Sequence, residues 1–177
     1  NGMLYLGHGS KLWKSDGTAS GTTPVKTIAR IDFLALINGK ILFSAYNSDY
    51  GEELWQSDGT TGGTTLLKDI NPAGSSKVSN ITNVNGEAYF SANDGDGIAL
   101  WKSDGTEAGT VKIKQIATPY SSSAPGVSPD TERMYFSARD NTNLRYLWKT
   151  DGTEAGTYIV TTKCINPKKM FEIGETL

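Results

Sequence analysis

The chain has 177 residues, a formal net charge of −2, twenty glycines and one cysteine. This length allows one domain with a substantial core. Because the sequence has no basic run, we expect neither nucleic acid nor an anionic membrane surface as a partner. The longest apolar stretch, 33–37, is too short to span a bilayer, so no membrane insertion is expected. Cys164 is the one cysteine, which excludes an internal disulfide and a thiolate metal cluster.

Four copies of one sequence pattern run through the chain. Each copy reads Leu-Trp-x-x-Asp-Gly-Thr-x-x-Gly-Thr, and its tryptophans lie 42, 46 and 47 residues apart. These tryptophans are Trp13, Trp55, Trp101 and Trp148. A period of about 40–50 residues is typical of a propeller blade with four strands. The repeat therefore predicts an all-β fold built from four blades.

The second copy shows the strands expected in one blade. In chain order they lie at 31–37, 41–45, 53–56 and 65–70. Asn38-Gly39 separates the first two strands and predicts a two-residue hairpin, because both positions tolerate a positive φ. Four consecutive antiparallel strands make a meander. On the third strand Leu54 and Trp55 point to opposite faces, so we expect each to meet a different neighbouring blade.

A repeated acid follows each third strand, at the turn into the fourth. A carboxylate at this point can accept hydrogen bonds from turn amides, and the glycine after it supplies a positive φ. We therefore interpret these acids as turn braces, although four acids in register also suit a metal site. The four acids are Asp16, Asp58, Asp104 and Asp151.

The chain ends are expected to complete one blade together. The first copy lacks its inner strand, and residues 170–177 resemble that missing strand. This predicts a four-bladed β-propeller closed by pairing of the N- and C-terminal strands, which removes free edges. The same ends pairing across two chains would make a larger ring, so a monomer or small homo-oligomer is expected. We expect one domain over 1–177 with four repeats. The first repeat combines 170–177 with 1–28, and the other three cover 31–70, 78–116 and 124–163.

The copies resemble the bacterial ELWxxDGTxxGT repeat, which occurs in tandem in proteins predicted to be extracellular. Glu53 supplies the acid before Leu in one copy, whereas Lys11, Ala99 and Tyr146 depart from the pattern. The resemblance implies a β-propeller fold and an extracellular or cell-surface location. It implies no catalytic residue.

Variable loops on one face of the predicted disc are the candidate binding sites, because function is often carried by loops on a rigid scaffold. Their planar amides, carboxylates and aromatic rings suit sugar hydroxyls and sugar C–H faces, although the same composition is ordinary in solvated turns. The candidate ligand-binding residues are His8, Tyr46, Asn47, Asp49, Tyr50, Asn93, Asp94, Asp96, Tyr120, Arg139, Asp140 and Asn141. No cofactor is expected beyond a weak calcium alternative, for which the candidates are Asp49, Glu52, Asp94 and Asp96.

The sequence therefore favours a non-enzymatic, multivalent, lectin-like module that binds glycans. The first alternative is a scaffold for protein–protein interaction or adhesion that presents one disc face to a protein surface. The second is an enzyme with its site at the channel mouth. Asp32, Glu172 and Glu175 are acids on expected inner strands, but they have no evident partner pattern, and no catalytic residue is assigned.

Overall fold

A computed structural model describes the chain except residues 1, 118–125, 130–133, 141, 143 and 166–177. The described residues contain fifteen strands, arranged in four antiparallel sheets, and no helix. No segment of this part of the chain is therefore a helix long and apolar enough to cross a membrane. The prediction of an all-β fold is confirmed.

Each sheet is a meander in which strands that follow one another in sequence pair with one another. The first sheet contains β1 (Leu4–His8), β2 (Lys11–Ser15) and β3 (Thr23–Thr27). The second contains β4 (Ala29–Ile37), β5 (Lys40–Asn47), β6 (Gly51–Ser57) and β7 (Thr65–Lys68). The third contains β8 (Ser79–Val84), β9 (Glu87–Asn93), β10 (Ile98–Ser103) and β11 (Val111–Ala117). The fourth contains β12 (Gly126–Pro129), β13 (Met134–Arg139), β14 (Arg145–Thr150) and β15 (Tyr158–Ile165).

Local sequence signals account for these strands. Asn38 and Gly39 join β4 to β5 with φ values of 48° and 80°, as the predicted two-residue hairpin requires. In the described residues the first sheet has three strands, and residues 170–177, predicted to supply its inner strand, lie outside them. The strands predicted for the second copy are confirmed within a few residues at their ends.

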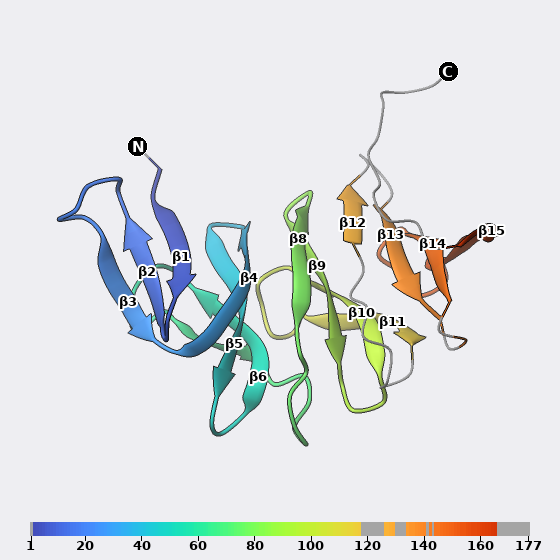
Figure 1. The fold of residues 1–177 in the computed structure, drawn as a ribbon, viewed down its shortest axis with the longest axis horizontal. Helices are drawn as coiled ribbons and strands as arrows, with labels where there is room; N and C mark the ends of the chain where they lie inside the picture. Colours follow the sequence, from blue (N-terminus) through green and yellow to red (C-terminus); the bar gives the residue numbers. More distant parts are fainter. Residues whose placement is uncertain (1, 118–125, 130–133, 141, 143, 166–177) are drawn as a thin grey trace.

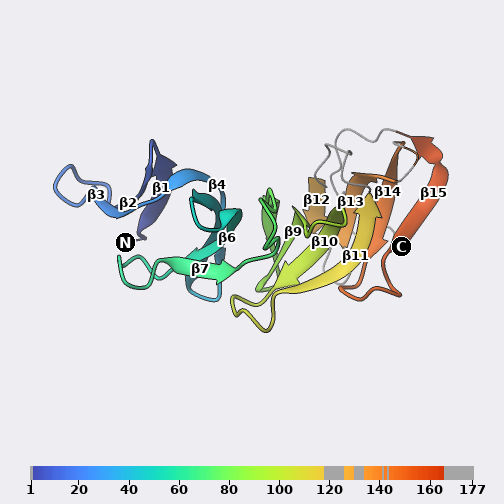
Figure 2. The ribbon, with the colours of Figure 1, turned by 90° about the horizontal axis from the view of Figure 1, so that it is seen from below.

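The four sheets stand in a row (Figures 1 and 2). The strand β4 contacts β1 and β8, and β8 contacts β12, so neighbouring sheets adjoin in chain order. The first and fourth sheets lie at opposite ends, and in the described residues the row is open. The sequence predicts that the two chain ends close the ring, but residues 1 and 170–177 lie outside the described residues. The closed propeller therefore stays a prediction.

The cores lie between neighbouring sheets. Leu54 is buried in a cluster with residues of the third sheet, whereas Trp55 is buried in a cluster with residues of the first. The expectation that Leu and Trp of one strand serve two different neighbours is therefore confirmed. Stacked rings join two strands within a sheet, as in Phe136 and Trp148, whose ring centroids are 5.9 Å apart.

Lysines also connect neighbouring sheets. A lysine on the last strand of one sheet donates a hydrogen bond to a backbone carbonyl in the repeated turn of the next sheet. The distances are 2.6 Å from Lys26 Nζ to Thr64 O, 3.3 Å from Lys68 Nζ to Glu107 O and 2.6 Å from Lys114 Nζ to Thr157 O. Each of these hydrogen bonds thus links a sheet to the repeated turn of the sheet that follows it in the chain.

Candidate functional site

The repeated turn uses its acid for its own backbone. In the third copy Asp104 Oδ1 accepts hydrogen bonds from Thr106 Oγ1 at 2.7 Å and from Thr106 N at 2.8 Å. The hydroxyl of Thr106, followed by its backbone N–H, lowers the pKa of Asp104 below its usual value. The threonine two residues after Asp16, Asp58 and Asp151 binds each of those acids in the same way.

These turn acids are therefore occupied by hydrogen-bond donors of their own chain. Within the ranges that the structure describes, no group of three or more His, Cys, Asp or Glu side chains is placed to hold a metal ion. The geometry fits the turn-brace interpretation rather than a row of metal sites.

Three loops meet where the second and third sheets adjoin, and we call this region the loop face. They are the loop 48–50 between β5 and β6, the loop 69–78 between β7 and β8, and the loop 94–97 between β9 and β10. Ser76 is the link between them: its N–H donates to Glu52 O at 2.9 Å, and its carbonyl accepts from Asn93 N at 2.7 Å. The middle loop is thus bonded to strands β6 and β9, which border the other two loops.

A buried carboxylate anchors this middle loop. Glu53 is fully buried, and its two oxygens accept the backbone N–H groups of Ile70 and Ser76, each at 2.8 Å. Burial raises the pKa of Glu53, and the charge of nearby Asp69 raises it further. Asp69 Oδ1 is itself buried and has no hydrogen-bond partner in the described part of the chain. Glu53 therefore acts as a positioning residue for the loop face.

Sequence reasoning treated Glu53 as a feature of the repeat and did not include it, or Asp69, among the site residues. The available signal was that one copy alone has an acid before its Leu-Trp pair. The same copy is followed by the polar loop 71–76, which supplies the N–H group of Ser76 for that acid.

The candidates on the second sheet lie at the edge of the loop face. Tyr46 is 38 % exposed, and the Arg30 guanidinium carbon lies 5.2 Å from the centre of its ring. Asn47 Oδ1 accepts a hydrogen bond from Asp49 N at 2.6 Å. Tyr50 is 43 % exposed. The two tyrosine rings are therefore open to a ligand, whereas the Asn47 amide oxygen is used within its own turn.

The candidates on the third sheet are engaged within their own loop. Asn93 Oδ1 accepts from the N–H groups of Gly95 and Gly97, at 2.8 Å and 3.2 Å. Asp94 Oδ1 accepts from Asp96 N at 3.2 Å, and its Oδ2 is 2.5 Å from Lys112 Nζ. A lysine thus already balances the charge of Asp94. On the second sheet, Glu52 Oε1 accepts from Ser44 Oγ at 3.1 Å. Calcium binding by these acids stays a prediction.

The remaining candidates do not join the loop face. His8 is exposed at the end of β1 in the first sheet. Asp140 belongs to the fourth sheet, where its Oδ1 accepts from Thr142 N at 2.8 Å and from Thr142 Oγ1 at 2.6 Å. Arg139 ends β13 in the same sheet, and Asp32 is exposed on β4. Tyr120, Asn141, Glu172 and Glu175 lie outside the described residues.

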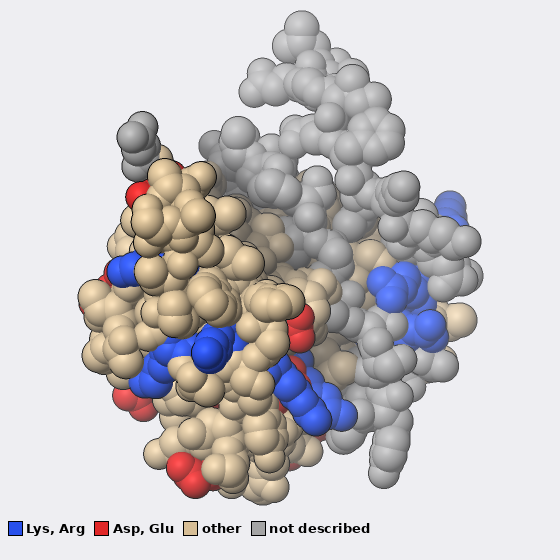
Figure 3. All heavy atoms as spheres, turned by 60° about the vertical axis from the view of Figure 1, so that its left-hand side comes forward, with Lys and Arg blue, Asp and Glu red and all other residues tan. Residues whose placement is uncertain are grey.

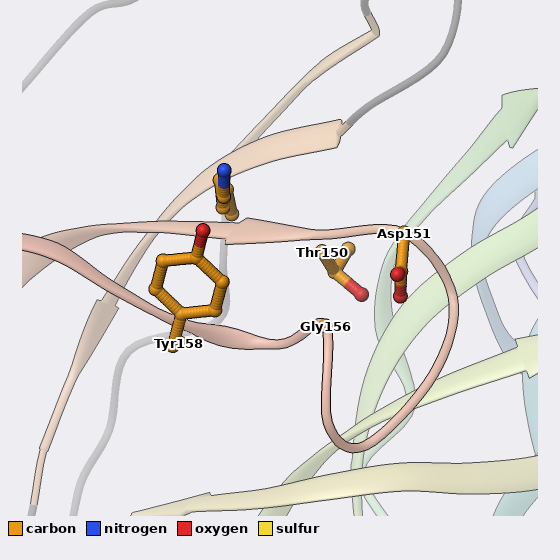
Figure 4. Close-up of a pocket in the computed structure, with 5 residues that line it drawn as sticks. Thr150, Asp151, Gly156 and Tyr158 are labelled. Carbon is orange, nitrogen blue, oxygen red and sulfur yellow. The ribbon is translucent and has the colours of Figure 1, made fainter.

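A small open pocket of about 230 Å³ lies on the fourth sheet (Figure 4). Thr150 and Asp151 border it from the end of β14, and Gly156 and Tyr158 border it from the start of β15. The ammonium group of Lys149, which also lines it, is 4.8 Å from the centre of the Tyr158 ring. The pocket thus combines the repeated turn with Tyr158, whose position is Thr23, Thr65 and Val111 in the other copies.

Comparison with known proteins gives structural relatives only. No family model and no curated protein matches the chain. Puromycin hydrolase matches with a TM-score of 0.57 and 15 % identity over 90 % of this chain and 25 % of the other. A mutant of puromycin hydrolase complexed with PGG gives a TM-score of 0.56 with the same identity and coverage. Acylaminoacyl peptidase of Pyrococcus horikoshii gives a TM-score of 0.53 and 15 % identity over 90 % of this chain and 27 % of the other.

The chain therefore spans about a quarter of the length of the solved proteins it matches, and the likeness is one of fold. These structural neighbours are hydrolases. That finding contradicts the prediction of a non-enzymatic, lectin-like binding module. The geometry gives a physical reason for the error: Asn47, Asn93, Asp94 and Asp140 bond to backbone groups of their own loops, as turn residues do. The resemblance to the ELWxxDGTxxGT repeat stays a prediction.

Proposed function

We propose that this chain is a β-propeller-type domain of a hydrolase that acts on peptide-like substrates, with the loop face bordering the path of the substrate. One observation carries the proposal: the row of four sheets matches hydrolases along 90 % of the chain while covering about a quarter of their length. A domain of this kind forms one part of a larger hydrolase. In the proposal, the four sheets are four blades of its propeller.

The reacting groups of such a hydrolase are not assembled on the loop face. Hydrolysis by a Ser-His-acid arrangement needs a histidine within hydrogen-bond reach of a nucleophile and an acid. His8 is the one histidine of the sequence. It is exposed on the first sheet, and in the described residues no hydrogen bond joins it to a serine or a carboxylate. We therefore assign to the loop face a role in admitting and orienting the substrate beside the reacting groups.

The side chains open on the loop face suit a peptide-like substrate. Tyr46 and Tyr50 present partly exposed rings, which can pack against apolar or aromatic side chains of the substrate. Arg30, stacked on Tyr46, carries a guanidinium group that can donate to substrate carbonyl oxygens. Glu53 keeps the neighbouring loop in place through two buried hydrogen bonds. The surface is thus held fixed before a substrate arrives, which reduces the entropy cost of binding.

The proposal is tested by steady-state hydrolysis of puromycin and of acylaminoacyl p-nitroanilides by the protein that carries these residues. Replacing Tyr50 with alanine is expected to raise KM by about three- to tenfold and to change kcat by less than about twofold, because Tyr50 contacts substrate away from the reacting bond.

Tyr158→Ala is the matched control. The exposed fraction of Tyr158 is 45 %, close to the 43 % of Tyr50, but Tyr158 lies over the pocket of the fourth sheet. Its replacement should leave KM and kcat unchanged. If a hydrolase that contains this chain cleaves neither substrate class, or if KM rises equally for both variants, the proposal is contradicted.

A further inference from the structure

The junction between the first and second sheets joins two different faces. The first sheet contributes a leucine face, on which Leu12 and Val25 lie, and the second contributes a tryptophan face, on which Ile41, Phe43 and Trp55 lie. These five side chains belong to one buried cluster. The faces differ in composition, so the junction has a direction along the row.

The same junction occurs twice more. Between the second and third sheets it is formed by Leu54, Leu67, Ala88, Phe90 and Trp101. Between the third and fourth it is formed by Leu100, Ile113, Met134, Phe136 and Trp148. In both, the leucine face belongs to the earlier sheet and the tryptophan face to the later one. In all three junctions a leucine face thus packs on the tryptophan face of the next copy.

Among the described residues, one face of each kind has no partner sheet. On the tryptophan face of the first sheet, Leu4 is 62 % exposed, whereas its repeat equivalent Ile41 is 5 % exposed. On the leucine face of the fourth sheet, Val160 is 42 % exposed, whereas its equivalent Val25 is 5 % exposed. The two faces lie at opposite ends of the row (Figure 2). Figure 3 brings the end with the first sheet forward and shows mostly uncharged surface, crossed by a band of basic side chains.

A lysine adds a polar contact at the junction between the first and second sheets. Lys14 of the first sheet donates from Nζ to Gly59 O in the turn of the second sheet, at 3.2 Å. Its equivalent in the fourth sheet is Lys149, whose ammonium group lies over the Tyr158 ring beside the open pocket. The fourth sheet has Thr161 at the position of Lys26, so this second lysine contact is not repeated there.

We propose that two copies of the chain associate head to tail through these faces. The leucine face of the fourth sheet in one copy packs on the tryptophan face of the first sheet in the other. Lys149 then donates to the carbonyl of Gly17 of the partner subunit, as Lys14 does to Gly59. Because the contact is heterologous, two copies cover all four end faces when they close a ring. This inference rests on the sheet junctions and concerns the chain of 177 residues; within a larger hydrolase propeller, further sheets of the same protein would cover these two faces instead.

The test is the molar mass of the full chain in solution, measured by light scattering and native mass spectrometry over a range of concentrations. The unchanged chain is expected to reach twice its 19.0 kDa as concentration rises. Leu4→Glu and Val160→Glu should each shift the midpoint of association at least about tenfold, because a charge would be buried in the junction. Both residues are exposed within one chain, so circular dichroism should show unchanged folding.

Leu36→Glu is the matched control, since Leu36 is also 62 % exposed but lies on β4 of the second sheet, away from both end faces. It should leave the association unchanged. Mixing Leu4→Glu with Val160→Glu should give a one-to-one dimer held by one unchanged junction, because each variant keeps the face that the other has lost, and this dimer should be weaker than the ring of the unchanged chain.

A single-chain mass at every concentration would overturn the proposal and would indicate that another segment or another sheet covers the end faces. A mixture of the two variants that stays monomeric would overturn the head-to-tail geometry. A Leu36→Glu effect equal to that of Leu4→Glu would also overturn it.

Discussion

The second glycine of the repeated turn gives the sharpest test of the turn geometry. A methyl carbon on Gly109 would overlap the carboxylate of Asp104, and the three atoms nearest to that methyl all belong to Asp104. Gly109→Ala must therefore displace the carboxylate from Thr106, which donates to it at 2.7 Å and 2.8 Å. Hydrogen bonds to a charged group contribute about 1.5–3 kcal/mol each, and less at an exposed turn. We expect Gly109→Ala to lower the free energy of unfolding by about 2 kcal/mol.

The assay is urea unfolding followed by tryptophan fluorescence. Gly62→Ala in the second copy is the matched control, because nothing lies within 4 Å of its added methyl group. The third and fourth copies already have Ala108 and Ala155 at that position. Gly62→Ala should be neutral or stabilising by up to about 1 kcal/mol, since alanine reduces the entropy of the unfolded chain.

A double-mutant cycle then isolates the cause. In an Asp104→Ala background the carboxylate is gone, so Gly109→Ala should cost much less than in the unchanged chain. If the cost of Gly109→Ala is the same in both backgrounds, or no larger than that of Gly62→Ala, the reasoning about the Asp–Gly contact is refuted.

Further predictions concern stability. Ser103→Ala should cost about 1–3 kcal/mol in urea unfolding, because it leaves the buried Thr110 hydroxyl, 2.7 Å away, without that partner; Ser48→Ala, in an exposed loop, should cost far less. Leu54→Ala should cost about 2–5 kcal/mol and Leu147→Ala less, since Leu54 is fully buried whereas Leu147 at the open end is only partly so; equal costs in the monomer would contradict the open row. Folding lowers the pKa of Asp104. Its contribution to stability is therefore present above about pH 3.8 and is lost as the pH falls through the lower pKa of the folded state. Folding raises the pKa of Glu53, so its contribution to stability is present below pH 4.5 and is lost as the pH rises through the higher pKa of the folded state. When urea midpoints are measured against pH, Glu53→Gln should remove the pH dependence that comes from Glu53 and keep the one that comes from Asp104.

The fold and the candidate site differed in how far the sequence predicted them. Strands, hairpins and the opposite placement of Leu54 and Trp55 were predicted because they depend on period and turn chemistry within one repeat. The buried state of Glu53 was not predicted, because its partners Ile70 and Ser76 reach it only when the loop 71–76 folds back over β6. The loop amides were misread as ligand groups, because composition alone does not show whether an Asn oxygen faces solvent or its own turn.

The sequence by itself determined the repeating unit of this protein. The glycines, threonines and acids of the turn satisfy one another within about ten residues, so each copy specifies the same sheet wherever it stands. Only the tertiary structure decided which copies of a face are covered. Leu4 and Ile41 occupy the same position in their repeats, yet one is 62 % exposed and the other 5 %. Burial of that position depends on a neighbouring sheet, and a local pattern carries no information about which sheet stands beside it.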